Sequence, residues 1–574
     1  MEMIFVQVAG IFSYLREITQ FLPLRGGHKK MPDMKFVTSL GTMAALAVAL
    51  SGCSGSSGGG SVSISTTSAN FAVAGNPYTS TLVAVGGSPP FTWAVVSGLP
   101  AWVSLNAATG VLTGNPTTSD VGNFNPIFRV TDSAGATGFG SVLLAVHNRT
   151  DILSVDNSTP PVPGNAVSSK PAISSDGRFV AFASSSNLIS GVGGSQIYLH
   201  DWQTNQTSLV SRDSGTTINP GNGVSDTPSI SADGRFVAFV SSSTNLVPGV
   251  SGQLIYLRDV QAGVTSLVSK DNFGNPASAG SKNTAPSISG DGRFIAFVSN
   301  ATNFGTSGQQ IYLHDTQVSG AFPNGQTILI SKDNTTPTPI PGNGTSDTPS
   351  ISNDECFIAF TSASSNLGAP PNQIFVRGPL AIPGCAGTEV TTLASKDNSG
   401  NPASAVGLTT INPSISGNGR FIAFVSNATN FGASGQQIYL HDTQVSGAFP
   451  NGQTILISKD TTTSTPIPGN FPSDSPSISI DGCFVAFTSQ STNLRAPANQ
   501  ILIRGPLAIG GCVGFEQTSL VSKDSAGNPA NSVAGGTIDP SANGNGQFIA
   551  FSSTATNLVT PPPGNRQIYV RAMP

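Results

Sequence analysis

Charged residues are scarce in this sequence. Asp, Glu, Lys and Arg make up only 9% of the 574 residues, and the formal net charge is −4. So little charge provides neither a basic stripe nor an acidic tail, and we therefore expect no nucleic-acid partner. Histidine and cysteine are also rare, with 5 residues each. The chain instead contains 65 Gly and 41 Pro, which indicates turn-rich all-β units in a chain too long for one domain.

The N-terminal region has no apolar run of comfortable transmembrane length. The run over residues 36–50 follows Lys29, Lys30 and Lys35 and ends in Leu50-Ser51-Gly52-Cys53. This pattern resembles a bacterial lipoprotein signal. The resemblance implies that residues 1–53 are a signal region and that Cys53 becomes the lipidated first residue of the mature protein. An uncleaved anchor is the alternative.

The same resemblance implies a location. Ser54, rather than Asp, follows Cys53, and in the Gram-negative sorting pattern this implies the outer membrane. We expect a cell-envelope protein on the periplasmic or the external side, held to the membrane by its lipid alone. The basic flank would suit a signal peptide better if Met31 or Met34 were the true start.

A flexible tether and a small β domain follow. Residues 54–60 are only Ser and Gly, which predicts a flexible coil. Residues 61–147 alternate short β-prone runs with turns, as a β-sandwich does. The segments 99–105, 109–116 and 130–135 resemble the Ig-like, cadherin-like repeats of bacterial surface proteins, which implies a spacer or adhesion module. Asp120 and Asp132 could join a calcium site, but turn formation is the favoured interpretation. For Trp93 and Trp102, core packing is favoured over sugar stacking.

The rest of the chain repeats one motif seven times. The copies begin at Pro171, Pro228, Pro286, Pro349, Pro413, Pro476 and Pro540, between 57 and 64 residues apart. Each contains four short β-prone runs, the first two joined by a turn such as Asp233-Gly234. The repeats resemble those of TolB-type, WD40-like propellers, which implies a seven-bladed β-propeller over residues 150–574. The last copy lacks its fourth run, and residues 150–156 match the missing one, so an N-terminal strand should close the ring.

Four cysteines besides Cys53 lie in the repeats. Cys356 and Cys385 belong to the fourth copy, Cys483 and Cys512 to the sixth, and each pair is 29 residues apart. Within a blade, both connections that carry them emerge on one face, so we predict one disulfide in each copy and an oxidising compartment. A four-cysteine zinc site would need ligands from two blades that are not neighbours and lacks the short Cys-x-x-Cys spacing.

The repeats show no obvious catalytic residues. His200, His314 and His441 occupy one slot of the repeat, which holds Arg258, Arg377, Arg504 and Arg571 in the other copies. A slot that exchanges His for Arg indicates a structural role. We find no carboxylate pair unique to one blade, as glycosidase chemistry would require. We therefore assign no catalytic, metal or cofactor residue.

The expected function is a non-catalytic binding platform in the cell envelope, for a protein or a glycan. The loops between repeats, with those joining the second and third runs, should share one face and are the candidate binding surface. Two alternatives stay open. One is a propeller enzyme that acts on polysaccharide, like a lyase, and the other is a structural or adhesion protein of the cell surface.

Overall fold

The computed structural model describes residues 61–318, 325–335, 338–404, 410–445, 450–460, 467–509, 511–531 and 536–573. The signal region, the tether and Cys53 lie outside the described residues. Within this part of the chain every regular element is a β-strand or a short 3-10 turn. The protein is all-β, as the turn-rich composition predicts.

Residues 61–147 form the predicted β-sandwich. Trp93, Phe128 and Val130 are buried in its core, whereas Trp102 is half-buried against Tyr78, with ring centroids 5.4 Å apart. Asp132 accepts hydrogen bonds from the backbone of Ser88, Ala134 and Ala136 and therefore shapes a turn. The strands are β1 (Ser63–Ile64), β2 (Ala72–Val73), β3 (Tyr78–Thr81), β4 (Ala84–Val85), β5 (Thr92–Ser97), β6 (Val103–Leu105), β7 (Val111–Gly114), β8 (Gly122–Phe124), β9 (Ile127–Thr131), β10 (Thr137–Ser141) and β11 (Leu144–His147).

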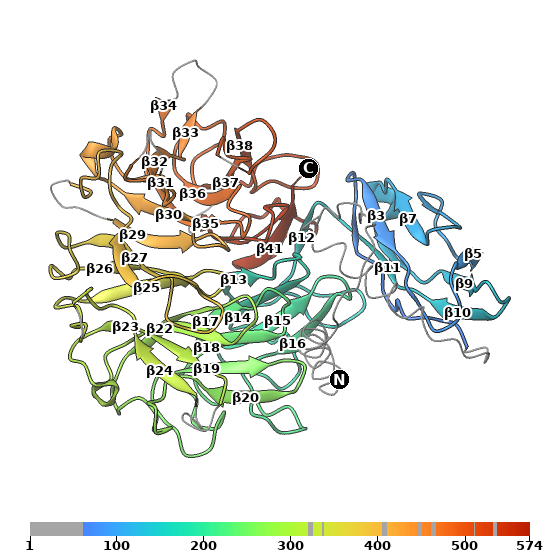
Figure 1. Cartoon of the computed structure of the whole chain (residues 1–574). Helices are drawn as coiled ribbons and strands as arrows, with labels where there is room; N and C mark the ends of the chain where they lie inside the picture. The colour runs from blue at the N-terminus through green and yellow to red at the C-terminus, as the bar shows by residue number, and fades with distance from the viewer. Residues whose placement is uncertain are drawn as a thin grey trace, which may run out of the picture. The chain divides into compact units, whose positions relative to one another are not determined.

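The repeats form seven four-stranded antiparallel sheets, the blades of a propeller (Figure 1). Blade 1 contains β13 (Ser168–Ile173), β14 (Phe179–Ser184), β15 (Gln196–Asp201) and β16 (Gln206–Leu209). Blade 2 contains β17 (Ser225–Ile230), β18 (Phe236–Ser241), β19 (Leu254–Asp259) and β20 (Val264–Leu267). Blade 3 contains β21 (Asn283–Ile288), β22 (Phe294–Ser299), β23 (Gln310–Asp315) and β24 (Gln326–Leu329).

Blade 4 contains β25 (Ser346–Ile351), β26 (Ile358–Ser362), β27 (Gln373–Gly378) and β28 (Val390–Leu393). Blade 5 contains β29 (Thr410–Ile415), β30 (Phe421–Ser426), β31 (Gln437–Asp442) and β32 (Gln453–Leu456). Blade 6 contains β35 (Ser473–Ile478), β36 (Val485–Ser489), β37 (Gln500–Gly505) and β38 (Gln517–Leu520), and the small pair β33 (Lys459–Asp460) and β34 (Ile467–Pro468) precedes it.

Blade 7 is completed by a strand from the start of the propeller, as predicted. It contains β39 (Thr537–Ala542), β40 (Phe548–Ser553) and β41 (Gln567–Ala572), and β12 (Thr150–Ile152) pairs antiparallel with β41. The first strands of successive blades contact one another around a closed circle that includes β39 and β13. The ring of blades is therefore closed by strand pairing, because β12 and β41 are far apart in the sequence.

Threonines of the fourth strands join neighbouring blades. In each blade a Thr hydroxyl donates a hydrogen bond of 2.5 to 3.3 Å to a carbonyl just after the fourth strand of the preceding blade, for example Thr265 Oγ1 to Arg212 O and Thr150 Oγ1 to Lys523 O. The other five are Thr207, Thr327, Thr391, Thr454 and Thr518. The repeated threonine is therefore a structural residue that holds adjacent blades together.

Candidate functional site

The central channel is narrow and mostly aliphatic. The first strands line a cavity of about 210 Å³ with one isoleucine from each of six blades, namely Ile173, Ile230, Ile288, Ile351, Ile415 and Ile478, and with Ala542 in blade 7. Serines beside them are engaged, since Ser229 Oγ accepts from Ile288 N and Ser287 Oγ from Ile351 N, both at 3.1 Å. The lining that this cavity shows contains no acid, base or cationic side chain.

The turns between first and second strands surround one end of the channel. Their backbones form a ring of hydrogen bonds from blade to blade, including Ser175 N to Ala232 O, Ala232 N to Gly290 O and Gly544 N to Ser175 O. A Cβ placed on Gly290 would lie 2.2 Å from Asn353 Oδ1, and one on Gly417 would lie 2.4 Å from Ile480 Cγ2. Side chains of neighbouring blades thus fill the space above these glycines.

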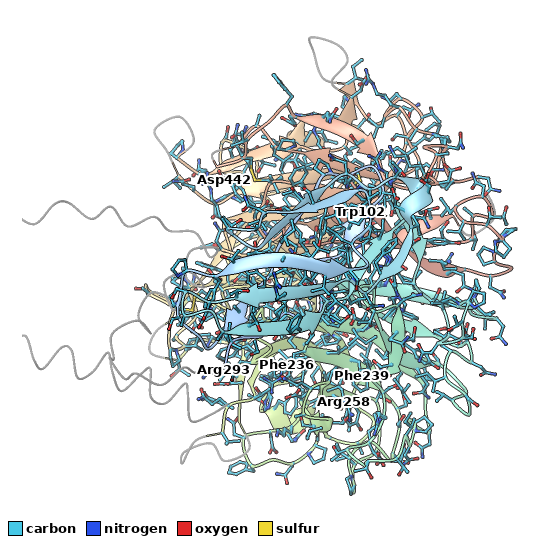
Figure 2. All side chains as sticks on the ribbon, turned by 90° about the vertical axis from the view of Figure 1, so that its right-hand side faces the viewer. Trp102, Phe236, Phe239, Arg258, Arg293 and Asp442 are labelled. Carbon is cyan, nitrogen blue, oxygen red and sulfur yellow. A yellow bond between two sulfur atoms is a disulfide. The ribbon has the colours of Figure 1, made fainter. Side chains whose placement is uncertain are left out.

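The slot that alternates between His and Arg lies on the third strands and is buried. His200 Nδ1 is 3.0 Å from Thr207 Oγ1, and Thr207 gives its own proton to Val155 O, so the ring nitrogen must be the donor. Burial, followed by the proximity of His147, lowers the pKa of His200 to about 4. In blade 2, Arg258 (Figure 2) donates from Nη1 to Thr265 Oγ1 at 2.9 Å. His and Arg therefore have the same role, which is to donate to the blade-joining threonine.

The two disulfides take the place of an ion pair that four of the other five blades share. In blades 1, 2, 3 and 5 an Arg after the first turn contacts the Asp that ends the third strand, as Arg293 does with Asp315 at 2.7 Å. Blades 4 and 6 carry Cys356 and Cys483 at the position of that Arg, bonded to Cys385 and Cys512 with Cα separations of 5.5 Å. Both predicted disulfides are present, and each anchors the long loop between third and fourth strands.

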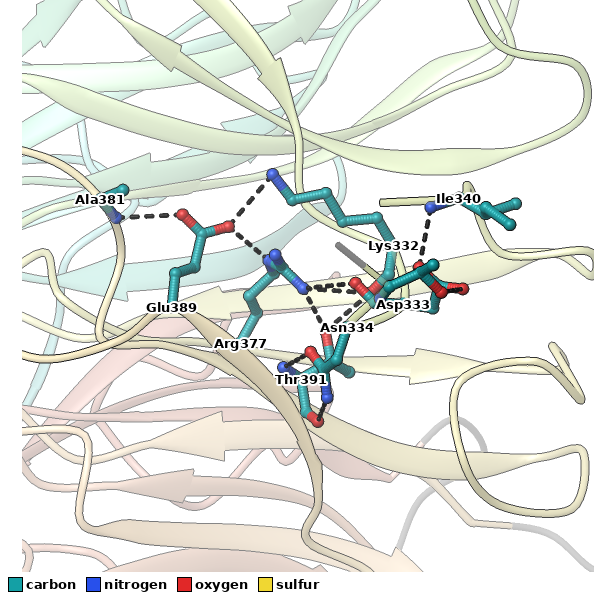
Figure 3. A network of polar contacts seen from close by, with 9 residues as sticks. Lys332, Asp333, Asn334, Ile340, Arg377, Ala381, Glu389 and Thr391 are labelled. Carbon is teal, nitrogen blue, oxygen red and sulfur yellow. Dashed lines mark hydrogen bonds and ion pairs between the residues drawn. The ribbon is translucent and has the colours of Figure 1, made fainter. Parts of the chain in front are cut away.

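A polar network fixes the far end of the same loop (Figure 3). The buried Arg377 donates from Nε to Glu389 Oε1 at 2.5 Å and from Nη1 to Thr391 Oγ1 at 2.6 Å, while Lys332 of the preceding connection lies 3.1 Å from Glu389. Burial is the largest single influence and acts to raise the pKa of Glu389, but the hydrogen bond from Arg377, the charges of Lys332 and Arg377 and the backbone N–H of Ala381 together outweigh it, so the pKa is lowered. Arg504 and Glu516 repeat the pair in blade 6 at 2.7 Å. The loops of these two blades are therefore fixed at both ends.

The first turn of blade 4 contains a residue that differs from its counterparts in the other blades and that the sequence pattern did not single out. Glu355 occupies the turn position that is Gly in the other six blades, and its φ is 71°, in the left-handed region that disfavours a side chain. Burial and a hydrogen bond with Asp291 of blade 3 raise its pKa to about 7. The pair joins blade 4 to blade 3 and does not lie within one blade, and the expectation that no single blade has its own carboxylate pair stays a prediction. A comparison of the repeats could have found Glu355 as the one non-glycine at this turn.

The two faces of the propeller differ in what they expose. On the face formed by the loops between blades, Phe273 is 86% exposed. On the opposite face, the loop that joins β37 to β38 in blade 6 carries Val513 and Phe515, which are 92% and 94% exposed. The corresponding loop of blade 4 has Ala386 and Thr388 at these positions. Large exposed apolar side chains on anchored loops are typical of contact points for a partner.

In the described ranges no three His, Cys, Asp or Glu side chains gather in a way that could hold a metal ion. Across those same ranges no helix has the length and apolarity to cross a membrane. The two disulfides agree with an oxidising, extracytoplasmic compartment.

The fold defines the class of this chain as an Ig-like β-sandwich followed by a β-propeller. The family described as "Putative Ig domain" matches residues 60–147. No curated protein matches the sequence. Similar solved structures include an oligogalacturonate lyase from Vibrio parahaemolyticus, with 12% identity over 85% of this chain and 99% of the other and a TM-score of 0.43.

Two further structures are similar. A "putative TolB" from Agrobacterium tumefaciens has 17% identity over 52% of this chain and 81% of the other, with a TM-score of 0.30. The β-propeller domain of the Trilobed protease from Pyrococcus furiosus has 12% identity over 71% and 93%, with a TM-score of 0.39. The solved structures that are similar include enzymes of several kinds, so the likeness does not identify an activity.

Proposed function

We propose that this chain is a non-catalytic platform of the bacterial cell envelope, anchored by a lipid on Cys53, that binds another protein or a glycan. The observation that carries the proposal is the anchored loop of blade 6, which holds Val513 and Phe515 in water. Covering the exposed apolar side chains with a partner removes them from water, which favours binding. A loop that is already fixed loses little further conformational entropy when it binds. The repeated His and Arg slot supports the same proposal, because its side chains are committed to joining blades.

The test of partner binding is crosslinking in intact cells of the native type, followed by capture of the chain and mass spectrometry. We expect one stoichiometric envelope partner, which is lost in a Val513→Ser, Phe515→Ser double variant. The matched control is Ala386→Ser with Thr388→Ser in blade 4, which should keep the partner. A separate Phe273→Ser variant asks whether the face formed by the loops between blades contributes. Equal capture by wild type and by all three variants would contradict the role of the anchored loop.

The lipid anchor has its own test. In cells fed an alkyne-tagged palmitate, the wild-type chain should carry the tag and sediment with outer membranes, whereas a Cys53→Ser variant should lose both properties. This outcome is expected because Cys53 ends the signal-like segment and precedes the Gly/Ser run. A Cys53→Ser chain that remained labelled would show that the lipid is attached to another residue.

A further inference from the structure

The sandwich and the propeller meet in a seam with defined contacts. Residues 61–574 form one compact unit, and β11 of the sandwich leads directly to β12 of the propeller. Phe71 of the sandwich packs against Trp202 and Phe548 of the propeller, with ring centroids 4.8 and 5.3 Å apart. Asn76 Nδ2 donates to Met573 O at 3.2 Å, and Gln203 Nε2 donates to Ala69 O. These bonds fix the two walls of the seam relative to each other.

A groove of about 680 Å³ lies along this seam. Its floor includes the buried residues Ala72, Val73 and Tyr78, whereas Asn70 on the sandwich side and Gln547 on the propeller side are exposed. Polar and apolar side chains contribute about equally to its lining. A hollow of several hundred Å³ between domains is a common position for a ligand site. By contrast, the central channel offers only about 210 Å³.

Two of the polar side chains that line the groove are amides without a partner among the described residues. In the described part of the chain, neither the Asn70 nor the Gln547 side chain forms a hydrogen bond, although both line the groove. An amide donates and accepts at once and so matches a sugar hydroxyl, which does the same. The rings of Phe71 and Phe548 are half-buried beside them and present apolar surface on which the C–H face of a sugar ring could pack.

The charges of the groove argue against an acidic ligand. Arg178 lines it, but its Nε and Nη2 already donate to the carboxylate of Asp201 at 2.8 and 2.7 Å. Asp176, also in the lining, is exposed and would repel an anion. An added peptide strand is also disfavoured, because Asn70 N donates to Ser80 Oγ at 3.1 Å and its segment already lies along β3.

We propose that this groove binds a neutral oligosaccharide, with Asn70 and Gln547 bonding its hydroxyls and Phe71 and Phe548 packing against its ring faces. The proposal deepens the binding role stated above and rests on it. The proposal names the class of ligand and places its binding site where the sandwich joins the propeller.

The test is affinity electrophoresis of the full mature chain in native gels containing mannan, hydroxyethyl cellulose or polygalacturonate, followed by calorimetric titration with oligosaccharides of the polymer that retards it. We expect at least one neutral polymer to retard the chain and polygalacturonate to leave it unaffected. An Asn70→Ala, Gln547→Ala double variant should bind about tenfold more weakly or worse, because two exposed hydrogen-bonding groups are removed. Gln261→Ala, which removes an exposed amide from blade 2 outside the groove, should bind as wild type does.

The proposal is overturned if no neutral polymer retards the chain, if only polygalacturonate does, or if the double variant binds as well as wild type. Circular dichroism of both variants separates a binding defect from misfolding. If the groove fails while crosslinked cells still yield an envelope partner, the platform function stands without this site. If both experiments return nothing, both proposals fail.

Discussion

At the scale of the residue, near-identical blades provide their own controls. In blade 3 the Tyr312 hydroxyl bonds to Thr306, whereas in blade 5 the Tyr439 hydroxyl is buried and has no partner among the described residues, and Ala433 stands where blade 3 has Thr306. Ala433→Thr should therefore stabilise the protein by about 1 kcal/mol, seen as a higher urea midpoint. The reverse change, Thr306→Ala, should destabilise by a similar amount. If neither change moved the midpoint, the hydroxyl pair would contribute nothing.

Glu355 predicts a pH dependence of stability. Its pKa is raised from 4.5 to about 7 by burial and by Asp291, with Asp315 adding to the rise and Arg293 opposing it. The folded state thus binds the proton more tightly than the unfolded state, so this contribution is fully present below about pH 4.5 and is lost as the pH rises through about 7. Glu355→Gln should flatten the change in urea midpoint between pH 5 and pH 8.

Glu355→Gly separates the charge from the backbone. It should remove the same pH dependence and also relieve the left-handed conformation at φ 71°, which costs a non-glycine residue roughly 1 kcal/mol. At pH 5 the Gly variant should therefore be more stable than the Gln variant. If the two variants are equally stable there, the backbone of this turn carries no strain.

At the scale of the element, the loop over residues 379–389 of blade 4 has two anchors. Removing the disulfide with Cys356→Ser and Cys385→Ser should cost about 2 to 4 kcal/mol, measured by urea unfolding. Glu389→Gln breaks the second anchor, the bond from Arg377. Because both anchors hold one loop, a double-mutant cycle should show that removing both lowers the free energy of unfolding by an amount that differs from the sum of the two separate losses by more than 0.5 kcal/mol. Simple additivity would mean that the anchors act independently.

The sequence alone predicts the strands, the blades and the closing strand, but it does not predict the contacts that form the candidate sites. Seven repeats predicted the blades, and the unmatched run at Thr150 predicted the closing strand, because both depend on local pattern. Equal spacing of Cys356 and Cys385, and of Cys483 and Cys512, predicted the disulfides. The pairing of Glu355 with Asp291 and the seam groove between Asn70 and Gln547 join residues of different blades or domains, and no local pattern records such contacts.

At the scale of the whole molecule, stability depends on a ring that is closed without a covalent bond. Thr150 Oγ1 donates to Lys523 O and accepts from Arg571 Nη1, both at 2.7 Å. Thr265 forms the equivalent bonds in blade 2 with Arg212 O and Arg258 Nη1, at 2.6 and 2.9 Å. Thr150→Val and Thr265→Val therefore remove equivalent hydrogen bonds. Each variant leaves a buried guanidinium, of Arg571 or of Arg258, without one of its acceptors, at a cost of about 1 to 3 kcal/mol.

The two variants should differ in how the ring opens. In blade 2 the strand that carries Thr265, β20, pairs with β19 and follows it directly in the chain, so local opening is limited, whereas β12 is held to β41 only by pairing, and its release exposes an edge. Amide hydrogen exchange should therefore accelerate strongly in β41 of the Thr150→Val chain and little in β19 of the Thr265→Val chain. Equal acceleration in both strands would mean that closure by β12 is no weaker than a covalently continuous blade.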